Sequence, residues 1–503
     1  MSRESVPRVV ILGGGFGGLY TALEFERRLA KGLRADVVLV NQENFFLFTP
    51  MLHEVAASDL DITDIVSPIR KLVRRVRFFQ ARVEAIDLEG RVVEVSHGAE
   101  HHHHRLEYDH LVLALGSVTN FHGLEGLEEN AVTMKSLGDA IHLRNRLIAN
   151  LEEADLECCA HAREGLMTVV VAGGGFAGVE TLAGVNDFVR EALEAYPNLE
   201  EAQLRMILVH SGEEILPELG AELGSYARRK LVERGVTVLL GRRVAAATAD
   251  GVTLNDGTFL ATRTLVWAAG TAPHPAIAAL PCARERGRVR VGPTLEAEGR
   301  PGVWALGDCA HVMDPAVPGG YPPTAQHALR QGKVVARNVI ARWRGREARP
   351  FSFRALGQLA AIGRRTGVAR ILGLQFSGFA AWFLWRTIYL GKLPRLEKKL
   401  RVMLGWTLDL FFSKDLVQFL TLRSSGVSHE EAASRGKSEP PGQPLAAIAS
   451  RSAAIMAPRS PSGPQPRATA IASTSASVAL AAATSDSSSS SAPREQRISQ
   501  SST

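Results

Sequence analysis

Two copies of one glycine-rich pattern constrain this chain more than any other feature. Residues 9–18 read VVILGGGFGG, and residues 169–178 read VVVAGGGFAG. Each copy predicts a buried strand, a tight turn and the start of a helix, the arrangement that holds a dinucleotide pyrophosphate at a helix N-terminus. One copy alone is weak evidence. Two copies indicate two dinucleotide sites, as in a flavoprotein that also binds a nicotinamide cofactor.

The glycines of each turn have separate physical tasks. Gly13 permits the tight turn, Gly15 lets the backbone approach a pyrophosphate, and Gly18 lets the helix pack close to the strand. We therefore expect two sets of cofactor-binding residues: Gly13, Gly14, Gly15, Phe16, Gly17 and Gly18 in the first turn, and Gly173, Gly175 and Gly178 in the second.

The strand after each glycine turn is expected to end in an acid that binds the cofactor ribose. Asn41 and His210 stand at these positions instead. Either Asn41 or the nearby Glu43 could bond ribose hydroxyls. His210 and Ser211 would tolerate a 2′-phosphate better than an acid would, so the sequence leaves NADPH open beside NADH.

Three further segments place polar groups near the predicted cofactors. Residues 301–311 predict a strand that returns the chain to the first nucleotide domain, with Asp308 either on a flavin ribityl chain or simply in a strand-end turn. Residues 44–52 are aromatic without a helical period, and predict a loop that either packs the core or sets Thr49 beside a flat ring. Residues 264–271 mirror the earlier strand end at 113–116, and Gly270 is expected at the second cofactor.

Two side chains are candidates for the chemistry. Glu180 is expected in the first turn of the second glycine-turn helix, facing the meeting point of the two cofactors. A helix-start carboxylate is the alternative role. Residues 322–332 open another helix, on which Gln326 and Arg330, four residues apart, share one face.

Composition narrows the class of protein. Of 503 residues, 46% are hydrophobic and 46 are glycine, which suits an α/β enzyme. A net charge of +6 is too modest to argue for nucleic acid but is compatible with an anionic membrane surface. The four cysteines form no C-x-x-C motif, which indicates a reducing compartment and no redox disulfide. Residues 101–104, four histidines, are expected to form a solvated loop, and we expect no metal.

The C-terminal third changes character. Residues 379–420 mix aromatic and basic side chains in two helix-length stretches, which suits helices lying in the headgroup layer of a membrane. A helical hairpin packed on the body or in a homodimer interface is the alternative. No apolar run reaches the roughly 20 residues of a spanning helix, and no leader segment is expected. Residues 424–503 are rich in Ser, Ala and Pro and are expected to be disordered.

The motifs together resemble the type II NADH:quinone oxidoreductases, over about residues 8–420. The segments that carry the resemblance are GGGFGG at 13–18, NFFLFTP at 44–50, GGGFAGVE at 173–180, GDCA at 307–310 and AQHALRQG at 325–332. The last is similar to the family's quinone-site segment A-Q-x-A-x-Q-Q-G, with Arg330 replacing one glutamine. His210 is a second departure, since the family usually has an acid there.

The resemblance implies an α/β fold with two Rossmann-like domains, non-covalent FAD and a C-terminal amphipathic membrane anchor. The FAD domain would be split by the inserted NAD(P)H domain. The expected ranges are an FAD domain at 1–125 and 286–345, an NAD(P)H domain at 165–285, a membrane-association region at 346–423 and a tail at 424–503. The protein would be peripheral, on the cytoplasmic face of the inner membrane.

The expected reaction passes electrons from NADH through the flavin to a quinone without proton pumping. Glu180 would position the nicotinamide or move a proton, and Gln326, beside Ala325, would hydrogen-bond the quinone carbonyl. Three alternatives stay open: a sulfide:quinone oxidoreductase, a soluble NAD(P)H reductase that donates to a protein such as a ferredoxin, and a flavin-binding sensor of low turnover.

Overall fold

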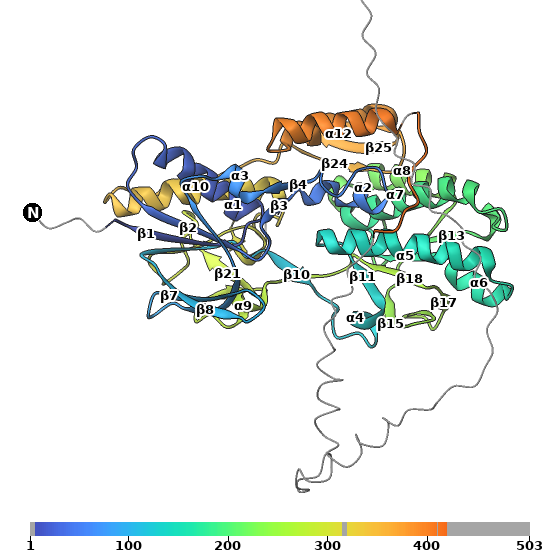
Figure 1. Ribbon diagram of the computed structural model, residues 1–503, viewed down its shortest axis with the longest axis horizontal. Coiled ribbons are helices and arrows are strands. Elements are labelled where there is room, and N and C mark those ends of the chain that lie inside the picture. Colours follow the sequence, from blue (N-terminus) through green and yellow to red (C-terminus); the bar gives the residue numbers. More distant parts are fainter. Residues whose placement is uncertain (1–5, 314–318, 410, 420–503) are drawn as a thin grey trace, which may run out of the picture. The chain divides into compact units, whose positions relative to one another are not determined.

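Two five-stranded parallel sheets organise the computed structural model, which describes residues 6–313, 319–409 and 411–419 (Figure 1). In order across the first sheet, the strands are β22 (Val303–Ala305), β9 (His110–Leu113), β1 (Arg8–Leu12), β2 (Asp36–Asn41) and β5 (Arg77–Gln80). In order across the second, they are β11 (Ala131–Thr133), β18 (Thr264–Trp267), β12 (Thr168–Ala172), β13 (Arg205–His210) and β14 (Val236–Leu240). Both central strands, β1 and β12, lead into a glycine turn, as predicted.

One edge strand of the first sheet comes from a part of the chain that follows the whole second sheet in sequence. β22 pairs in parallel with β9, Val303 opposite Leu111, although the whole second sheet lies between them in sequence. The two chain connections between the sheets run antiparallel as β10 (Ser117–Thr119) and β19 (Thr271–Pro273). The predicted α/β fold with a split first domain and an inserted second one is confirmed. The predicted domain limits stay predictions.

Helices cover one face of each large sheet and a small antiparallel sheet covers the other, which is why the central strands are continuous apolar runs. Val9 to Leu12 and Val169 to Ala172 are all buried. The helices are α1 (Phe16–Leu29), α2 (Leu52–Ala56), α3 (Ile69–Leu72), α4 (Leu127–Asn130), α5 (Leu137–Leu156), α6 (Ala160–Leu166), α7 (Phe176–Ala192), α8 (Ala221–Glu233), α9 (Pro275–Ala278) and α10 (Ala325–Trp343). Single 3-10 turns are Thr49–Met51, Leu193–Ala195, Glu201–Gln203, Pro217–Leu219 and Gly307–Cys309.

Small antiparallel sheets flank the two large ones. They pair β3 (Phe45–Leu47) with β4 (Val66–Pro68), β6 (Arg82–Asp87) with β7 (Val92–His97) and β8 (His102–Glu107), and β15 (Val244–Thr248) with β16 (Gly251–Leu254) and β17 (Phe259–Ala261). A further sheet joins β20 (Arg284–Glu285), β21 (Arg288–Val291) and β23 (Ala310–Val312), with β21 and β23 parallel.

The C-terminal region contains a small sheet in addition to the two helical stretches expected within residues 379–420. A three-stranded sheet, β24 (Gly357–Ala361), β25 (Gly367–Ile371) and β26 (Leu374–Ser377), precedes α11 (Gly378–Lys392) and α12 (Leu396–Leu408). α11 packs on this sheet, so it buries one face instead of lying free. Trp385 is fully buried and Trp406 is 7% exposed. The predicted tail at 424–503 lies outside the described residues.

Two predicted loops were wrong. Within the predicted loop at 44–52, residues 45–47 form β3, because β4 supplies a partner strand that the local sequence does not reveal, and Thr49–Met51 form a 3-10 turn. His102 to His104 belong to β8, where pairing with β7 sets His103 opposite Ser96. Their side chains are exposed, as expected of a solvated segment.

Candidate functional site

The two glycine turns share the same features at corresponding glycines. Gly13 and Gly173 have φ of +101° and +119°, a region that side chains rarely adopt. A Cβ on Gly18 would lie 1.8 Å from the Gly13 carbonyl oxygen, and one on Gly178 would lie 1.9 Å from that of Gly173. The space beside Gly15 and beside Gly175 is open for 4 Å, and no side chain caps α1 or α7. Both turns therefore fit the pyrophosphate of a dinucleotide.

Asn41 and His210 have matching structural roles. The Gly14 N–H donates to Asn41 Oδ1 at 2.6 Å, and the Gly174 N–H donates to His210 Nδ1 at 3.1 Å. Asn41 also donates from Nδ2 to the Glu43 carbonyl. Each side chain at the end of a second strand thus braces its own glycine turn. Since His210 Nδ1 accepts, the neutral ring carries its proton on Nε2 and presents a donor where an acid was expected.

One large cavity, of about 1010 Å³, joins most of the predicted site residues. Its walls come from both glycine-turn regions, from α10 and from the end of α11. The predicted residues that line it are Gly15, Phe16, Gly17, Thr49, Glu180, Gly270, Asp308, Ala325 and Gln326. The predicted residues outside its lining are Gly13, Gly14, Gly18, Asn41, Gly173, Gly175, Gly178 and His210. The cavity thus covers the region where two cofactors would meet, while the outer residues shape the turns behind it.

Asp308 has two partners that the sequence analysis missed. Ser117 Oγ donates to Asp308 Oδ2 at 2.7 Å, and Lys135 Nζ donates to Ser117 Oγ at 3.0 Å. Burial lowers the pKa of Lys135, while the Asp308 charge acts in the opposite direction. Ser117 follows the strand end at 113–116 and was within reach of sequence reasoning. Lys135 comes from the connection before α5, where no motif marks it.

Glu180 lies in the second turn of α7, not in the first as predicted, because the helix begins at Phe176. A helix-start role therefore does not explain this carboxyl. Its Oε1 accepts from the Ala361 N–H at 3.0 Å and from Trp385 Nε1 at 2.9 Å. Burial raises the pKa of Glu180 to about 8, against the opposing effect of these two bonds. Near neutral pH the side chain is a protonated acid on the cavity wall.

The α10 end of the cavity is basic. Arg330 donates to the Gln326 carbonyl at 2.8 Å and lies 3.9 Å from the centre of the Phe353 ring. Gln326 Nε2 donates to the Gly357 carbonyl at 3.3 Å. Lys392 lines the same cavity, and burial together with the charge of Arg330 lowers its pKa. Tyr389 lines the same end of the cavity.

No cysteine lines the cavity among the described residues. Cys158 and Cys159 are exposed between α5 and α6. Cys309 is buried beneath the first sheet, where its thiol donates to the Leu113 carbonyl, and burial raises its pKa to about 11.

Fold and cavity together define a two-dinucleotide flavoprotein, and the comparisons with known proteins agree. Residues 7–332 match the family model of the pyridine nucleotide-disulphide oxidoreductases, and residues 356–415 match the NDH2 C-terminal domain. The chain is 32% identical to the type II NADH:quinone oxidoreductase Ndh of Mycobacterium tuberculosis, over 81% of this chain and 89% of that one. It is 33% identical to the demethylphylloquinone reductase NdbB of Synechocystis, over 80% and 96%.

A solved structure of NDH2 from Plasmodium falciparum, in complex with NADH, has the same fold. Its TM-score is 0.76 at 19% identity, covering 82% of this chain and 99% of that one. The chain belongs to the type II NADH:quinone oxidoreductase family.

Proposed function

We propose that this chain oxidises NADH and reduces a quinone, with FAD bound at the first glycine turn. The observation that carries the proposal is the large cavity, which is lined by the first turn, by Glu180 of the second domain and by Gln326 of α10. The flavin would supply the transfer of electrons between the two substrates. The protein would orient both substrates at one ring and exclude water from it.

The residue roles follow from the geometry. The free N–H groups at the start of α1 would bind the FAD pyrophosphate, and Asp308, held by Ser117, would accept from the ribityl hydroxyls. The second glycine turn would bind NADH. Glu180, a buried acid, would hold a proton beside the reacting atoms. Gln326 and Arg330 would donate to the quinone oxygens.

A two-step mixing experiment tests the function. NADH mixed with the flavin-loaded protein should bleach the flavin absorbance, and a quinone added in a second mix should restore it. NADPH should also bleach the flavin, because β13 ends in His210 and not in the acid that would repel a 2′-phosphate. His210→Glu should slow the NADPH reaction about tenfold or more, as two like charges in contact cost at least ~1.4 kcal/mol, and leave NADH oxidation near its original rate. A reduced flavin that no quinone reoxidises would contradict the proposal.

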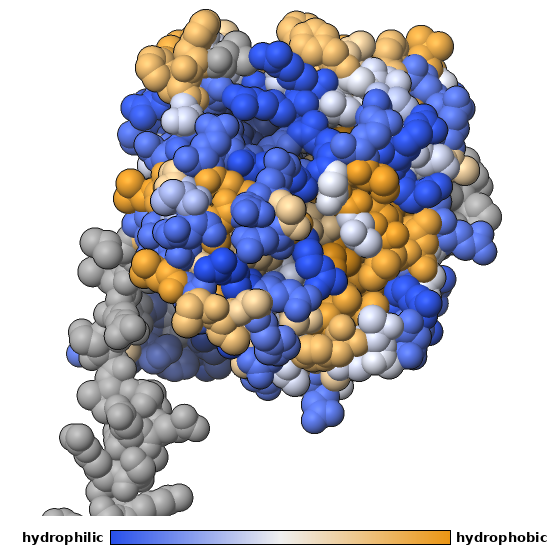
Figure 2. All heavy atoms as spheres, turned by 90° about the vertical axis from the view of Figure 1, so that its right-hand side faces the viewer, coloured by the Kyte–Doolittle hydropathy of each residue, from blue (hydrophilic) through white to orange (hydrophobic). Residues whose placement is uncertain are grey.

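We further propose that α11, α12 and their neighbours rest on a membrane surface. These elements carry large apolar side chains that are at least 46% exposed: Leu372, Leu374, Phe379, Phe383, Leu396, Leu400, Met403, Leu404, Leu408, Phe411, Phe412 and Val417. Figure 2 shows hydrophobic residues along the upper edge of the molecule, the edge at which Figure 1 places α12. No helix within the described ranges is both long and apolar enough to cross a bilayer. The cytoplasmic face of the inner membrane is the proposed location.

Vesicle binding tests the membrane surface. Replacing both Phe379 and Phe383 by serine should weaken binding to vesicles that contain anionic lipid by about 100-fold, since each buried phenyl ring contributes at least ~1.5 kcal/mol. Flavin reduction by NADH should not change. The matched control is Phe259→Ser, which removes an equally exposed ring from β17. The alternative is that a second copy of the chain covers this apolar surface. Sedimentation of the same proteins tests it by measuring their oligomeric state. If the double variant bound vesicles as the parent does, or only broke a dimer, the membrane proposal would be wrong.

A further inference from the structure

A second, smaller cavity lies behind Glu180. Its volume is about 50 Å³, which is room for water. It is bounded by α2, α7, α11 and the end of α12, and by the turn between β24 and β25. His53 and Glu180 line both this cavity and the large one. The two spaces therefore share a wall made of two titratable side chains.

The interior of the small cavity is polar although it is buried. Glu54 is 4% exposed, and its Oε2 accepts from Trp406 Nε1 at 3.0 Å. Arg386 is sandwiched between Trp382 and Trp406, with its guanidinium 4.4 Å from each ring centre. Arg386 Nε and Asp409 Oδ2 are buried without a protein partner. Buried polar atoms of this kind are satisfied by water, so the cavity is expected to be hydrated.

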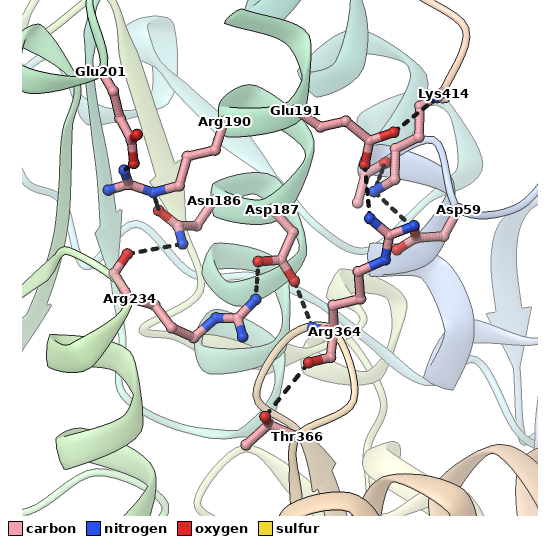
Figure 3. Close-up of polar contacts among 11 residues, drawn as sticks. Asp59, Asn186, Asp187, Arg190, Glu191, Glu201, Arg234, Arg364, Thr366 and Lys414 are labelled. Atoms are coloured by element: carbon pink, nitrogen blue, oxygen red, sulfur yellow. Dashed lines mark hydrogen bonds and ion pairs between the residues drawn. The ribbon is translucent and has the colours of Figure 1, made fainter. Parts of the chain in front are cut away.

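The outer end of the cavity is an ion-paired rim (Figure 3). Lys414 Nζ lies 2.7 Å from Asp59 Oδ1, and its backbone N–H donates to Glu191. The Arg364 N–H donates to Asp187, and its guanidinium pairs with Glu191. Asp59, Asp187, Arg364 and Lys414 line the cavity, while Glu191 does not. The side chains of Arg364 and Asp59 are 49% and 23% exposed, so the rim borders the protein surface.

The proposed reaction requires a proton from water. NADH delivers two electrons and one proton as hydride, and a quinone takes up two electrons and two protons to become a quinol. The balance is NADH + H⁺ + quinone → NAD⁺ + quinol. One proton per turnover must therefore enter the large cavity from solvent. This requirement rests on the function proposed above.

We propose that this proton passes through the small cavity, from Asp59 at the rim and from Asp409 in the interior to Glu54, and on through water to His53 and Glu180. Each member can accept a proton on one side and release one on the other. Glu54 is a relay residue, since it touches neither substrate. Glu180 is the last member, on the wall of the large cavity.

The charges around Glu54 keep it in the state that a relay needs. Burial is the largest cause that raises its pKa, to about 8, and the charges of Asp59 and Asp409 act in the same direction. Arg386 and the Trp406 N–H oppose them. Burial also raises the pKa of Asp409 to about 6 and lowers that of His53 to about 4. At neutral pH, Glu54 thus holds a proton, Asp409 is mostly ionised and His53 is a neutral ring. Asp187, Arg364, Arg365 and Lys414 complete the charged groups of the lining.

Glu54→Gln and Trp406→Phe test the path in the flavin-loaded protein, with the two-step mixing experiment run across pH in H₂O and D₂O. Glu54→Gln should slow reoxidation by quinone about tenfold or more and raise its solvent isotope effect, with the NADH step unchanged within about twofold. Trp406→Phe removes a donor that lowers the pKa of Glu54. The fall of the quinone step at high pH should therefore move to higher pH. Glu191→Gln, a carboxyl of the rim outside the cavity, is the matched control and should change neither step.

The proposal is overturned if both variants reproduce the parent's quinone step and its pH profile. It is also overturned if Glu191→Gln slows the quinone step as much as Glu54→Gln does, because loss of rim packing would then be the cause. If Glu54→Gln fails to retain FAD, the pH profile of Trp406→Phe decides. Failure of the underlying function looks different, since the reduced parent protein would then not be reoxidised by quinone at any pH.

Discussion

Replacing Gly18 by valine is expected to give a chain that contains no FAD. A Cβ at this position lies 1.8 Å from the Gly13 carbonyl oxygen, so α1 must move away from β1 and the pyrophosphate cradle opens. Flavin absorbance of the purified protein measures the result. Gly138→Val is the matched control, because a Cβ there has its nearest neighbour at 3.6 Å, on the exposed start of α5.

A substitution in the second glycine turn should affect the reaction with NADH without affecting the binding of FAD. Gly178→Val produces the same collision, 1.9 Å from the Gly173 oxygen, and should retain FAD but lose flavin reduction by NADH. If Gly178→Val lost the flavin and Gly18→Val retained it, the assignment of the two turns would be reversed.

Glu180→Gln is expected to lower the rate of quinone reduction by about 100-fold to 10,000-fold, with much less effect on flavin reduction by NADH. The amide oxygen can still accept from Ala361 and Trp385, so the packing is retained while the acidic proton is lost. Because the pKa of Glu180 is about 8, the parent's quinone step should slow as pH rises through about 8. The variant should lose the part of this fall that Glu180 causes, while the part that Glu54 causes remains.

The carboxyl of Glu180 also makes the free energy of unfolding depend on pH. Its raised pKa determines the direction of that dependence. Between the ordinary value of 4.5 and about 8, the unfolded chain releases this proton while the folded protein keeps it. The free energy of unfolding should therefore fall as pH rises, by up to ~1.4 kcal/mol per pH unit, and Glu180→Gln should show a shallower fall. Glu24→Gln controls for loss of a buried carboxyl, since Glu24 is ion-paired with arginines on α1 and α10 outside both cavities. If Glu24→Gln lost as much quinone reduction as Glu180→Gln, a specific role for Glu180 would be excluded.

The parallel sheets could be predicted because their strands are buried on both faces and end in glycine turns. These are local signals, readable at residues 9–18 and 169–178. The sheet β24–β26 was missed because its strands are short and become stable only by pairing with one another and packing on α11. The local sequence does not reveal such partner strands, which also explains why residues 45–47 and 102–104 were wrongly predicted to be loops.

The sequence predicted the site residues that stand beside a motif. It did not predict those that the fold brings to the site from other segments. Glu180 follows the second glycine turn and Asp308 follows the end of the returning strand β22, so the sequence places them near the cofactors. Lys135 and Trp385 reach them from segments without a motif. The sequence marked Trp385 and Trp406 as membrane-facing aromatics, but each indole N–H finds a buried carboxyl to bond, which turns it inward.

These two indoles also determine how far the chain can be shortened. Trp385 bonds Glu180 on α7, and Trp406 bonds Glu54 on α2, so the C-terminal segment fastens one helix from each nucleotide-binding half. A truncation before Gly378 would remove both fastenings and open both carboxyls to water. The proposed lipid contact and both of these hydrogen bonds lie in one piece of chain, so a form made soluble by deletion would be a looser and chemically altered enzyme.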